Sequence, residues 1–503
     1  MIPHAPILTI VLPIFAAFLT PVVSLVAKRF GVERARDWFV VGVAILMFVI
    51  VASMAPAVWG GEVLVYKLGG WSPPWGIVLA VDGLNLLVAL IIAGVVSLVA
   101  IYSVVYMERD SGLEKYYTLL MLVTAGSMGV TLTGDIFNLY VFFEIMSISS
   151  YALVAFRRNW DSVEAGIKYL VIGSLGTALL LLAIVFLYGL IGSLNIADLA
   201  WKLGEIKAIQ PLPMIVPLML TLFIAGFGIK IAMVPMHAWL PDAYQAAPSA
   251  VSALLSGATT TVGVYAMLRV SYMLFGALAI GTMFIILGLV TMVVGGLMAL
   301  VQRDLKRLLA YSCISQMGYI LLGVGFGTAM GIQGGLFHLL NNAINKVLLF
   351  MCAGAIVYRV GTSNLDELGG LGKNMPITAT LFVVGALAIS GVPPLNGFAS
   401  KWTIYVAGIE AGQPICTAIA VVMSALTLAY FLKAINLIFL GQRPEHLREV
   451  KEAPPLMLFP MLMLAAFCVV FGILPGLGID LVRPAQSAVM NQVGYIGSVM
   501  GTG

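Results

Sequence analysis

The chain has 503 residues, of which 61% are hydrophobic and only 10% are Asp, Glu, Lys or Arg, and its formal net charge is +4. Soluble domains carry about 25% charged residues, so this composition excludes a water-soluble fold and predicts a polytopic membrane protein. The basic residues fall in short loops and form no basic surface, so we expect no nucleic acid as a partner.

The apolar segments are long enough to cross a bilayer as helices, because about 20 apolar residues span its hydrocarbon core. We predict about fourteen such helices. The chain is therefore expected to form one all-α transmembrane domain over residues 1–503, and the weakly amphipathic tail is expected on the membrane surface. The predicted helices cover residues 5–29, 37–58, 77–106, 114–133, 135–156, 162–191, 213–240, 247–274, 277–302, 304–326, 331–360, 376–411, 413–441 and 454–475.

Most of the 26 Lys and Arg residues lie in loops that fall on one side if the N-terminus is placed outside the cell. Loops rich in Lys and Arg stay in the cytoplasm. We therefore predict a multi-pass protein of the cell (plasma) membrane with both termini outside.

The four cysteines stand far apart in apolar segments, at Cys313, Cys352, Cys416 and Cys468. Zinc and iron–sulfur sites need clustered thiolates. We expect this chain to hold no metal and no cofactor.

Ionisable residues inside apolar segments are the most informative feature. Each costs several kcal/mol at membrane depth unless it is paired or hydrated, and such residues mark ion pathways. A series of them predicts an ion-translocating protein. They are Glu144, Lys168, Lys230, Lys346, Lys401 and Lys433.

Two of the predicted helices are interrupted near mid-span. Lys230 comes just before Pro235, and Pro393-Pro394 comes before Lys401. Proline breaks a helix, and freed carbonyls at membrane depth need protein or water. The separation in sequence between Lys168 and Lys346 is similar to that between Lys230 and Lys401. We therefore predict two inverted five-helix repeats, over 114–274 (helices four to eight) and 277–441 (helices nine to thirteen), with broken helices seven and twelve.

Glu144 is expected to lie near Lys168 or Lys230. A carboxylate that approaches and leaves a buried lysine changes how tightly the amine holds its proton, so such a pair would act as a proton gate. The alternative is a static structural ion pair.

His338, Asn342 and Lys346 share one helix face, at spacing i, i+4 and i+8. With water between them they would carry protons along the membrane plane; the alternative is a polar stripe that joins helices. Lys401 is the candidate terminal proton site, and Lys433 is a weaker candidate that can simply reach the membrane surface. His237 and Asp242 are candidates for proton uptake, or for capping a helix junction.

Five motifs resemble those of a known family. They are FFEIMSISSY, MHAWLPDAYQAAPSAVSALLSG, RDLKRLLAYSCISQMGYI, HLLNNAINKVLLF and GVPPLNGFASKW. The chain resembles the antiporter-like subunits of Mrp-type Na⁺/H⁺ antiporters (the D-type subunit) and of respiratory complex I (the N, M and L subunits), with relatives in membrane-bound hydrogenases and sulfane reductases. The resemblance implies fourteen helices with two inverted repeats, a Glu144–Lys230 gating pair, a central relay at Lys346 and a distal site at Lys401.

Two departures from the family pattern affect the predicted path. Ser256 and Thr261 occupy the places in helix eight where the family often has Lys or His, and Asn342 stands where many members have a second His. The link between the two halves is therefore expected to depend on water and hydroxyl groups.

The expected function is proton translocation by a subunit that performs no bond chemistry itself, within an Mrp-type antiporter or a redox-driven complex such as a hydrogenase, sulfane reductase or NADH dehydrogenase. Expected partners are other membrane subunits, a peripheral redox arm with iron–sulfur clusters, and lipids. The alternatives are a stand-alone secondary solute transporter and a structural scaffold subunit that has lost conduction.

Overall fold

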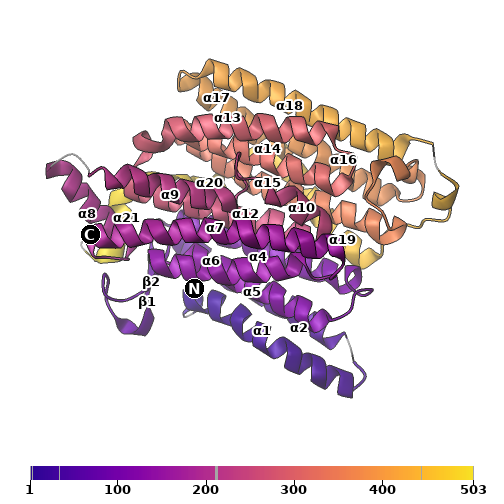
Figure 1. The fold of residues 1–503 in the computed structure, drawn as a ribbon, viewed down its shortest axis with the longest axis horizontal. Helices are drawn as coiled ribbons and strands as arrows, with labels where there is room; N and C mark the ends of the chain where they lie inside the picture. Colours follow the sequence, from indigo (N-terminus) through magenta and orange to yellow (C-terminus); the bar gives the residue numbers. More distant parts are fainter. Residues whose placement is uncertain (1, 3, 33, 210–212, 443, 502–503) are drawn as a thin grey trace.

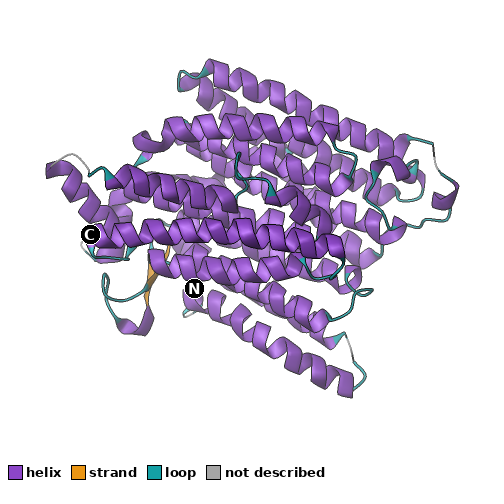
Figure 2. Ribbon diagram, viewed as in Figure 1, coloured by secondary structure: helices purple, strands orange, loops and turns teal. Residues whose placement is uncertain are grey.

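A bundle of long helices with nearly parallel axes forms the molecule (Figure 1), and Figure 2 shows how little of it is strand. This computed structural model describes residues 2, 4–32, 34–209, 213–442 and 444–501. Within those residues, 11 helices are long and apolar enough to cross a membrane, and two shorter apolar helices accompany them. The prediction of a multi-pass helical membrane protein is confirmed.

The first part of the chain differs most from the prediction just before α4. The helix expected from residue 77 begins only at Gly83, because the Asp82 carboxylate accepts hydrogen bonds from the first free backbone N–H groups. The residues before it form β2, which pairs antiparallel with β1 so that Leu64 lies opposite Val81, and the fold is therefore not wholly α. The elements are α1 (Ala5–Arg29), α2 (Ala35–Ala52), α3 (Ala55–Trp59), β1 (Leu64–Lys67), η1 (Leu68–Gly70), β2 (Val78–Val81) and α4 (Gly83–Tyr106).

The next part contains the first predicted break. Helix α9 ends at Lys230, and the chain runs irregularly until α10 begins at Trp239. The following helix contains two π-helical turns, η2 and η3, and lies wholly inside the bundle. The elements are α5 (Leu113–Leu132), α6 (Ile136–Val154), α7 (Trp160–Ile191), α8 (Ile196–Ile209), α9 (Ile215–Lys230), α10 (Trp239–Ala246), α11 (Ser249–Leu254), η2 (Leu255–Thr259), α12 (Thr260–Val270) and η3 (Ser271–Phe275).

The last part contains the second break, between α16 and α17, where Pro393-Pro394 cannot continue a helix. The two lysines lie on opposite sides of their breaks, since Lys230 precedes one and Lys401 follows the other. The elements are α13 (Ala277–Val301), α14 (Leu305–Gly325), α15 (Ala329–Val360), η4 (Leu365–Glu367), η5 (Leu371–Lys373), α16 (Pro376–Ser390), α17 (Asn396–Glu410), α18 (Pro414–Ile435), η6 (Asn436–Leu440), η7 (Glu445–Leu447), α19 (Pro455–Ile473), α20 (Pro475–Met490) and α21 (Gln492–Met500).

Several features of the two halves match. Helices α7 and α15 both have 32 residues. Asp135 caps α6 and bridges to Asn195, just as Asp304 caps α14 and bridges to Asn364. Aligned from their first residues, however, α7 and α15 place Lys168 opposite Phe337. This alignment does not pair Lys168 with Lys346, and the correspondence of these two lysines stays a prediction.

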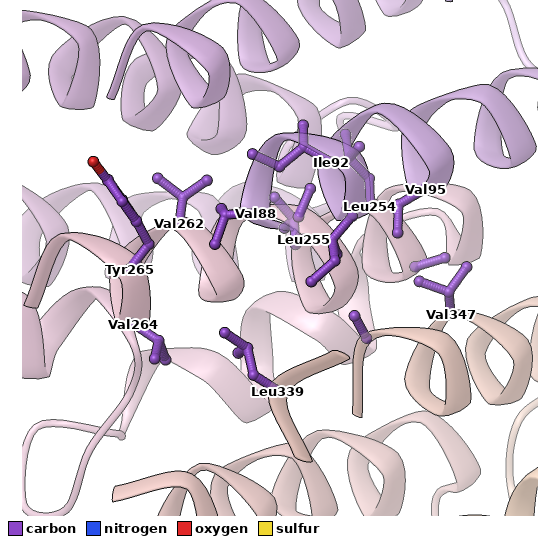
Figure 3. Close-up of a cluster of buried hydrophobic side chains, with 14 of the residues drawn as sticks. Val88, Ile92, Val95, Leu254, Leu255, Val262, Val264, Tyr265, Leu339 and Val347 are labelled. Atoms are coloured by element: carbon purple, nitrogen blue, oxygen red, sulfur yellow. The ribbon is translucent and has the colours of Figure 1, made fainter. Parts of the chain in front are cut away.

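A cluster of buried apolar side chains joins α4, the helix over residues 249–275 and α15 (Figure 3). Val88, Ile92 and Val95 of α4 pack there with Leu254 and Leu255, and Leu339 and Val347 of α15 lie against them. The C-terminal tail packs on α4, where a side chain on Gly83 would overlap the Pro484 backbone. The start of α1 lies at the same end of the bundle as α8 and α21 (Figure 1).

Candidate functional site

Lys230 is buried, with only 6% of its surface exposed, and neutral groups hold its amine. Its Nζ donates to Ser147 Oγ at 2.8 Å, to Tyr151 Oη at 3.3 Å and to the Gly173 carbonyl at 3.1 Å. An ammonium has three donors, so these three acceptors satisfy it completely. Helices α6 and α7 supply all three.

Glu144 is half-buried on α6, one turn before Ser147. Within the described residues it forms no ion pair. The expected pairing with Lys168 is wrong, because the Lys168 Nζ lies 2.8 Å from Glu164 and 2.9 Å from Asp242 instead. Nor is Lys168 buried at membrane depth: 45% of its side chain is exposed, since its flexible stem carries the charge to a polar pocket at the helix ends.

That pocket has a volume of about 520 Å³ and lies between the two halves of the chain. Asp242 joins the halves there, because its carboxylate accepts from Lys168 of α7 and, at 3.1 Å, from Arg307 of α14. Lys306 is buried beside it and donates to the carbonyls of Gln245 and Ala247. His237 lies in the break after α9, outside this lining. The pocket therefore gathers Asp242, but not His237.

Lys346 is fully buried on α15. Its Nζ donates to Ser312 Oγ at 2.6 Å, and Ser312 in turn shares a hydrogen bond of 2.9 Å with Tyr430 Oη. The partners again are neutral hydroxyl groups.

His338 lies two helical turns before Lys346 on the same face of α15. Its Nδ1 lies 3.0 Å from Ser400 Oγ, and its Nε2 lies 3.1 Å from Gln316 Oε1. Ser400 immediately precedes Lys401 in α17, so His338 lies between Lys346 and the second break. The predicted polar face of α15 does point into the bundle.

Lys401 is 1% exposed and lies just after the second break. Its Nζ donates to Ser424 Oγ at 3.0 Å, and Ser424 donates to the Ser390 carbonyl at the end of α16. The same Nζ lies 4.3 Å from the centre of the Tyr319 ring, close enough for a cation–π interaction.

Asn342 lies between His338 and Lys346, and among the described residues neither of its amide atoms nor Gln316 Nε2 has a hydrogen-bond partner. A buried amide without hydrogen bonds costs at least about 1–3 kcal/mol. Ordered water is the usual partner of such groups. These atoms therefore mark positions for water between Lys346 and His338.

The helix over residues 249–275 separates Lys230 from Lys346. Two of its hydroxyl groups are bonded to carbonyls of the same helix: Ser256 donates to Ala253 at 3.1 Å, and Thr261 to Gly257 at 2.8 Å. In the described part of the chain no series of hydrogen bonds joins the two lysines. The expected link across this helix through water and hydroxyl groups stays a prediction.

A buried ion pair that was not predicted lies near the start of α4. Arg269 donates to both carboxylate oxygens of Asp82 at 2.7 Å and to Asn85, between the rings of Tyr265 and Tyr495. The only signal was one arginine at the end of an apolar run. Lys433, by contrast, caps α13 by donating to its last carbonyls, which is a structural role.

No cluster of three or more His, Cys, Asp or Glu side chains suited to a metal ion occurs among the residues that the structure describes. All four cysteines are free thiols, and Cys313, Cys352 and Cys468 are buried.

Comparison with known proteins gives two family matches. The profile of the transmembrane family "NADH:quinone oxidoreductase/Mrp antiporter" matches residues 133–427. The profile of the N-terminal region of chain 5 of NADH-ubiquinone oxidoreductase (complex I) matches residues 67–117. Together they cover the segments that carry the buried amines.

Individual relatives match over nearly their whole length. The chain is 36% identical to the N subunit of the NADH-quinone oxidoreductase of Desulforudis audaxviator, covering 94% of this chain and 96% of that one. It is 33% identical to the D-type subunit of the Na⁺/H⁺ antiporter of Alkalihalophilus pseudofirmus, covering 92% and 93%. A chain of the archaeal membrane-bound sulfane sulfur reductase superposes with a TM-score of 0.90 at 33% identity, covering 98% and 99%.

Proposed function

Because the chain belongs to the NADH:quinone oxidoreductase/Mrp antiporter transmembrane family, we propose that it is a proton-translocating subunit of a multisubunit membrane complex. One observation carries the proposal. Lys346, His338 and Lys401 are buried in one series and are bonded only to neutral side chains, with unpartnered amides between the first two. A cation at such depth is kept for transport more often than for stability.

The proposed path begins at the pocket that contains Asp242 and Lys168, where water reaches the protein. Lys230 takes up a proton near Glu144, and Lys346 relays charge in the second half. His338, with water at Asn342, passes the proton to Lys401. Lys433 stays outside the path, because it caps a helix.

We further infer that the chain crosses the membrane fourteen times and that residues 114–274 and 277–441 are inverted repeats. The equal lengths of α7 and α15 and the matching bridges of Asp135 and Asp304 support this arrangement. Both termini are proposed to lie outside the cell.

Sequence relatives of the chain occur in a Na⁺/H⁺ antiporter and in an NADH-quinone oxidoreductase. The driving force is proposed to come from neighbouring subunits. We propose other membrane subunits as partners and, in a redox-driven complex, a peripheral arm with iron–sulfur clusters.

The test uses the intact complex in sealed liposomes, with proton movement followed by a pH-sensitive dye. Lys230→Ala, Lys346→Ala and Lys401→Ala are expected to abolish translocation while the complex still assembles. Lys433→Ala is the matched control and should translocate normally, since its amine contacts only backbone carbonyls. If all three variants translocate like the wild type, the subunit is a structural scaffold. The hydroxyl groups of Ser256 and Thr261, which are bonded to carbonyls of their own helix, favour that alternative.

A further inference from the structure

We propose that Ser147, Tyr151 and the Gly173 carbonyl form a second, neutral seat for the Lys230 amine, and that the amine alternates between this seat and the Glu144 carboxylate. Ser147 and Tyr151 are then positioning residues for proton release. This inference rests on the proposed function and adds a state in which the Lys230 amine is bound away from the Glu144 carboxylate.

The count of hydrogen bonds supports the neutral seat. All three donors of the ammonium are used by Ser147, Tyr151 and Gly173. No donor is left for Glu144, which has no ion-pair partner in the described part of the chain. Lys230 must therefore release at least one of these acceptors before it can bind the carboxylate.

The spacing along α6 places the two seats next to each other. Glu144, Ser147 and Tyr151 follow at i, i+3 and i+7, so they line one face of the helix. Adjacent turns of a helix are about 5.4 Å apart. A lysine side chain has a flexible four-carbon stem and can cover that distance by changing rotamer, without movement of α9.

The packing around the neutral seat shows that it is a built site. A Cβ on Gly173 would overlap the Tyr151 hydroxyl, so only glycine lets this hydroxyl and the α7 carbonyl approach the same amine. Tyr151 is also held from behind by Tyr169, whose ring meets it edge-on at 4.5 Å between centroids. Ser147 and Tyr151 are both buried.

The two seats favour different protonation states. Beside Glu144 the amine is held as the charged ammonium, because a carboxylate stabilises it. At the neutral seat no carboxylate is hydrogen-bonded to the amine, so proton loss is opposed less strongly, and the hydroxyl groups can still donate to the neutral amine. The titratable groups that face Lys230 are Glu144 and Tyr151 of α6, with Tyr169 of α7 behind Tyr151.

The test measures proton translocation by the intact complex in liposomes with Ser147→Ala, Tyr151→Phe and Glu144→Gln. Each is expected to lower the rate about tenfold, the equivalent of losing one hydrogen bond to a charged group. Thr221→Ala is the matched control, because the exposed Thr221 hydroxyl of α9 donates to the Pro217 carbonyl of its own helix. It should translocate normally, and Ser147→Thr should restore the rate by keeping the hydroxyl.

Combining Glu144→Gln with Ser147→Ala separates positioning from general damage. If one amine alternates between two seats, the double variant is no slower than the slower single variant. If the two substitutions caused independent structural defects, their effects would multiply, and the double variant would translocate about a hundredfold more slowly. That result would overturn the inference. Wild-type translocation rates for both Ser147→Ala and Tyr151→Phe would overturn it too. Lys230→Ala distinguishes a failure of this inference from a failure of the proposed function. If Lys230→Ala translocates normally, the proposed function fails. If it is inactive while Ser147→Ala and Tyr151→Phe translocate normally, only the second seat fails.

Discussion

Each of the three lysines proposed to carry protons is held by hydroxyl groups and not by a carboxylate. Lys230 binds Ser147 and Tyr151, Lys346 binds Ser312, and Lys401 binds Ser424. When a lysine in a buried ion pair loses its proton, an unpaired carboxylate is left behind at high cost. Hydroxyl partners avoid that cost, because they can accept from the ammonium or donate to the amine.

Giving Lys346 a carboxylate partner is expected to block transport. In Ser312→Asp the new carboxylate would lie within hydrogen-bond reach of the Lys346 amine and hold it in the charged form. Translocation should fall about tenfold or more in liposomes containing the complex, whereas Ser312→Thr, which keeps the hydroxyl, should retain most of the rate. Equal rates for the two variants would contradict the role given to neutral partners.

The buried pair of Arg269 and Asp82 is expected to matter for stability. Both side chains are at most 5% exposed, so Arg269→Ala leaves a buried carboxylate unpaired, at a cost of about 3–5 kcal/mol. Thermal unfolding in detergent measures this. Arg303→Ala is the control, because its pair with Asp366 is 78% and 50% exposed and is worth at most about 1 kcal/mol. Similar losses in the two variants would contradict this account.

The sequence identified most of the ionisable residues but not their partners. Lys230, Lys346 and Lys401 are buried as predicted, because a charged residue within an apolar segment can be recognised from the sequence alone. The predicted position of the Lys168 amine was wrong, because the flexible side chain of a lysine near a helix end can extend either into the bundle or out to a polar pocket. Arg269 was missed for the opposite reason: a residue near the end of an apolar run can be drawn inward by a distant Asp.

Helices α16 and α17 meet at a break that brings their backbones very close. A Cβ on Gly397 would overlap the Ala388 carbonyl, so only glycine permits the contact. The break holds the Ser390 carbonyl near Ser424, and thereby positions the acceptor of Lys401. Prolines made this break predictable, but the glycine contact depends on a turn that sequence does not specify.

Gly397→Ala is therefore expected to push α17 away from α16 and to displace Lys401. Translocation should fall at least about tenfold, along with a loss of stability of about 1–3 kcal/mol from overpacking. The control is Gly189→Ala, since nothing lies within 4 Å of a Cβ at that helical position. If Gly397→Ala translocates as well as Gly189→Ala, the close contact does not position the site.

At the scale of the whole molecule, the two halves meet across the helix over residues 249–275. Composition and apolar segments were enough to predict a multi-pass bundle with two broken helices. The β1–β2 ribbon and the docked tail were not predicted, because short extended segments and amphipathic helices carry weak periodic signals. The proposed path within the second half has a hydrogen-bonded partner at each amine, whereas the crossing between halves has none.

The orientation of the molecule gives a separate prediction. A reporter fused after α21 should be active outside the cell, because Lys28 and Arg29 end α1 on the side proposed to be cytoplasmic. A single Cys introduced at Lys28 in a Cys-free background should react with an impermeant thiol reagent only after the cells are opened. A reporter that is active in the cytoplasm would reverse the proposed direction of proton movement.

The central claim is that protons pass between Lys346 and Lys401 through hydrated, neutral side chains. A cryo-electron microscopy map of the intact complex, at a resolution that shows ordered water, tests it most directly. The account predicts water density bound to the Asn342 amide and to Gln316 Nε2, joining Lys346 to His338. A dry space there, with apolar side chains packed between the two residues, would contradict it.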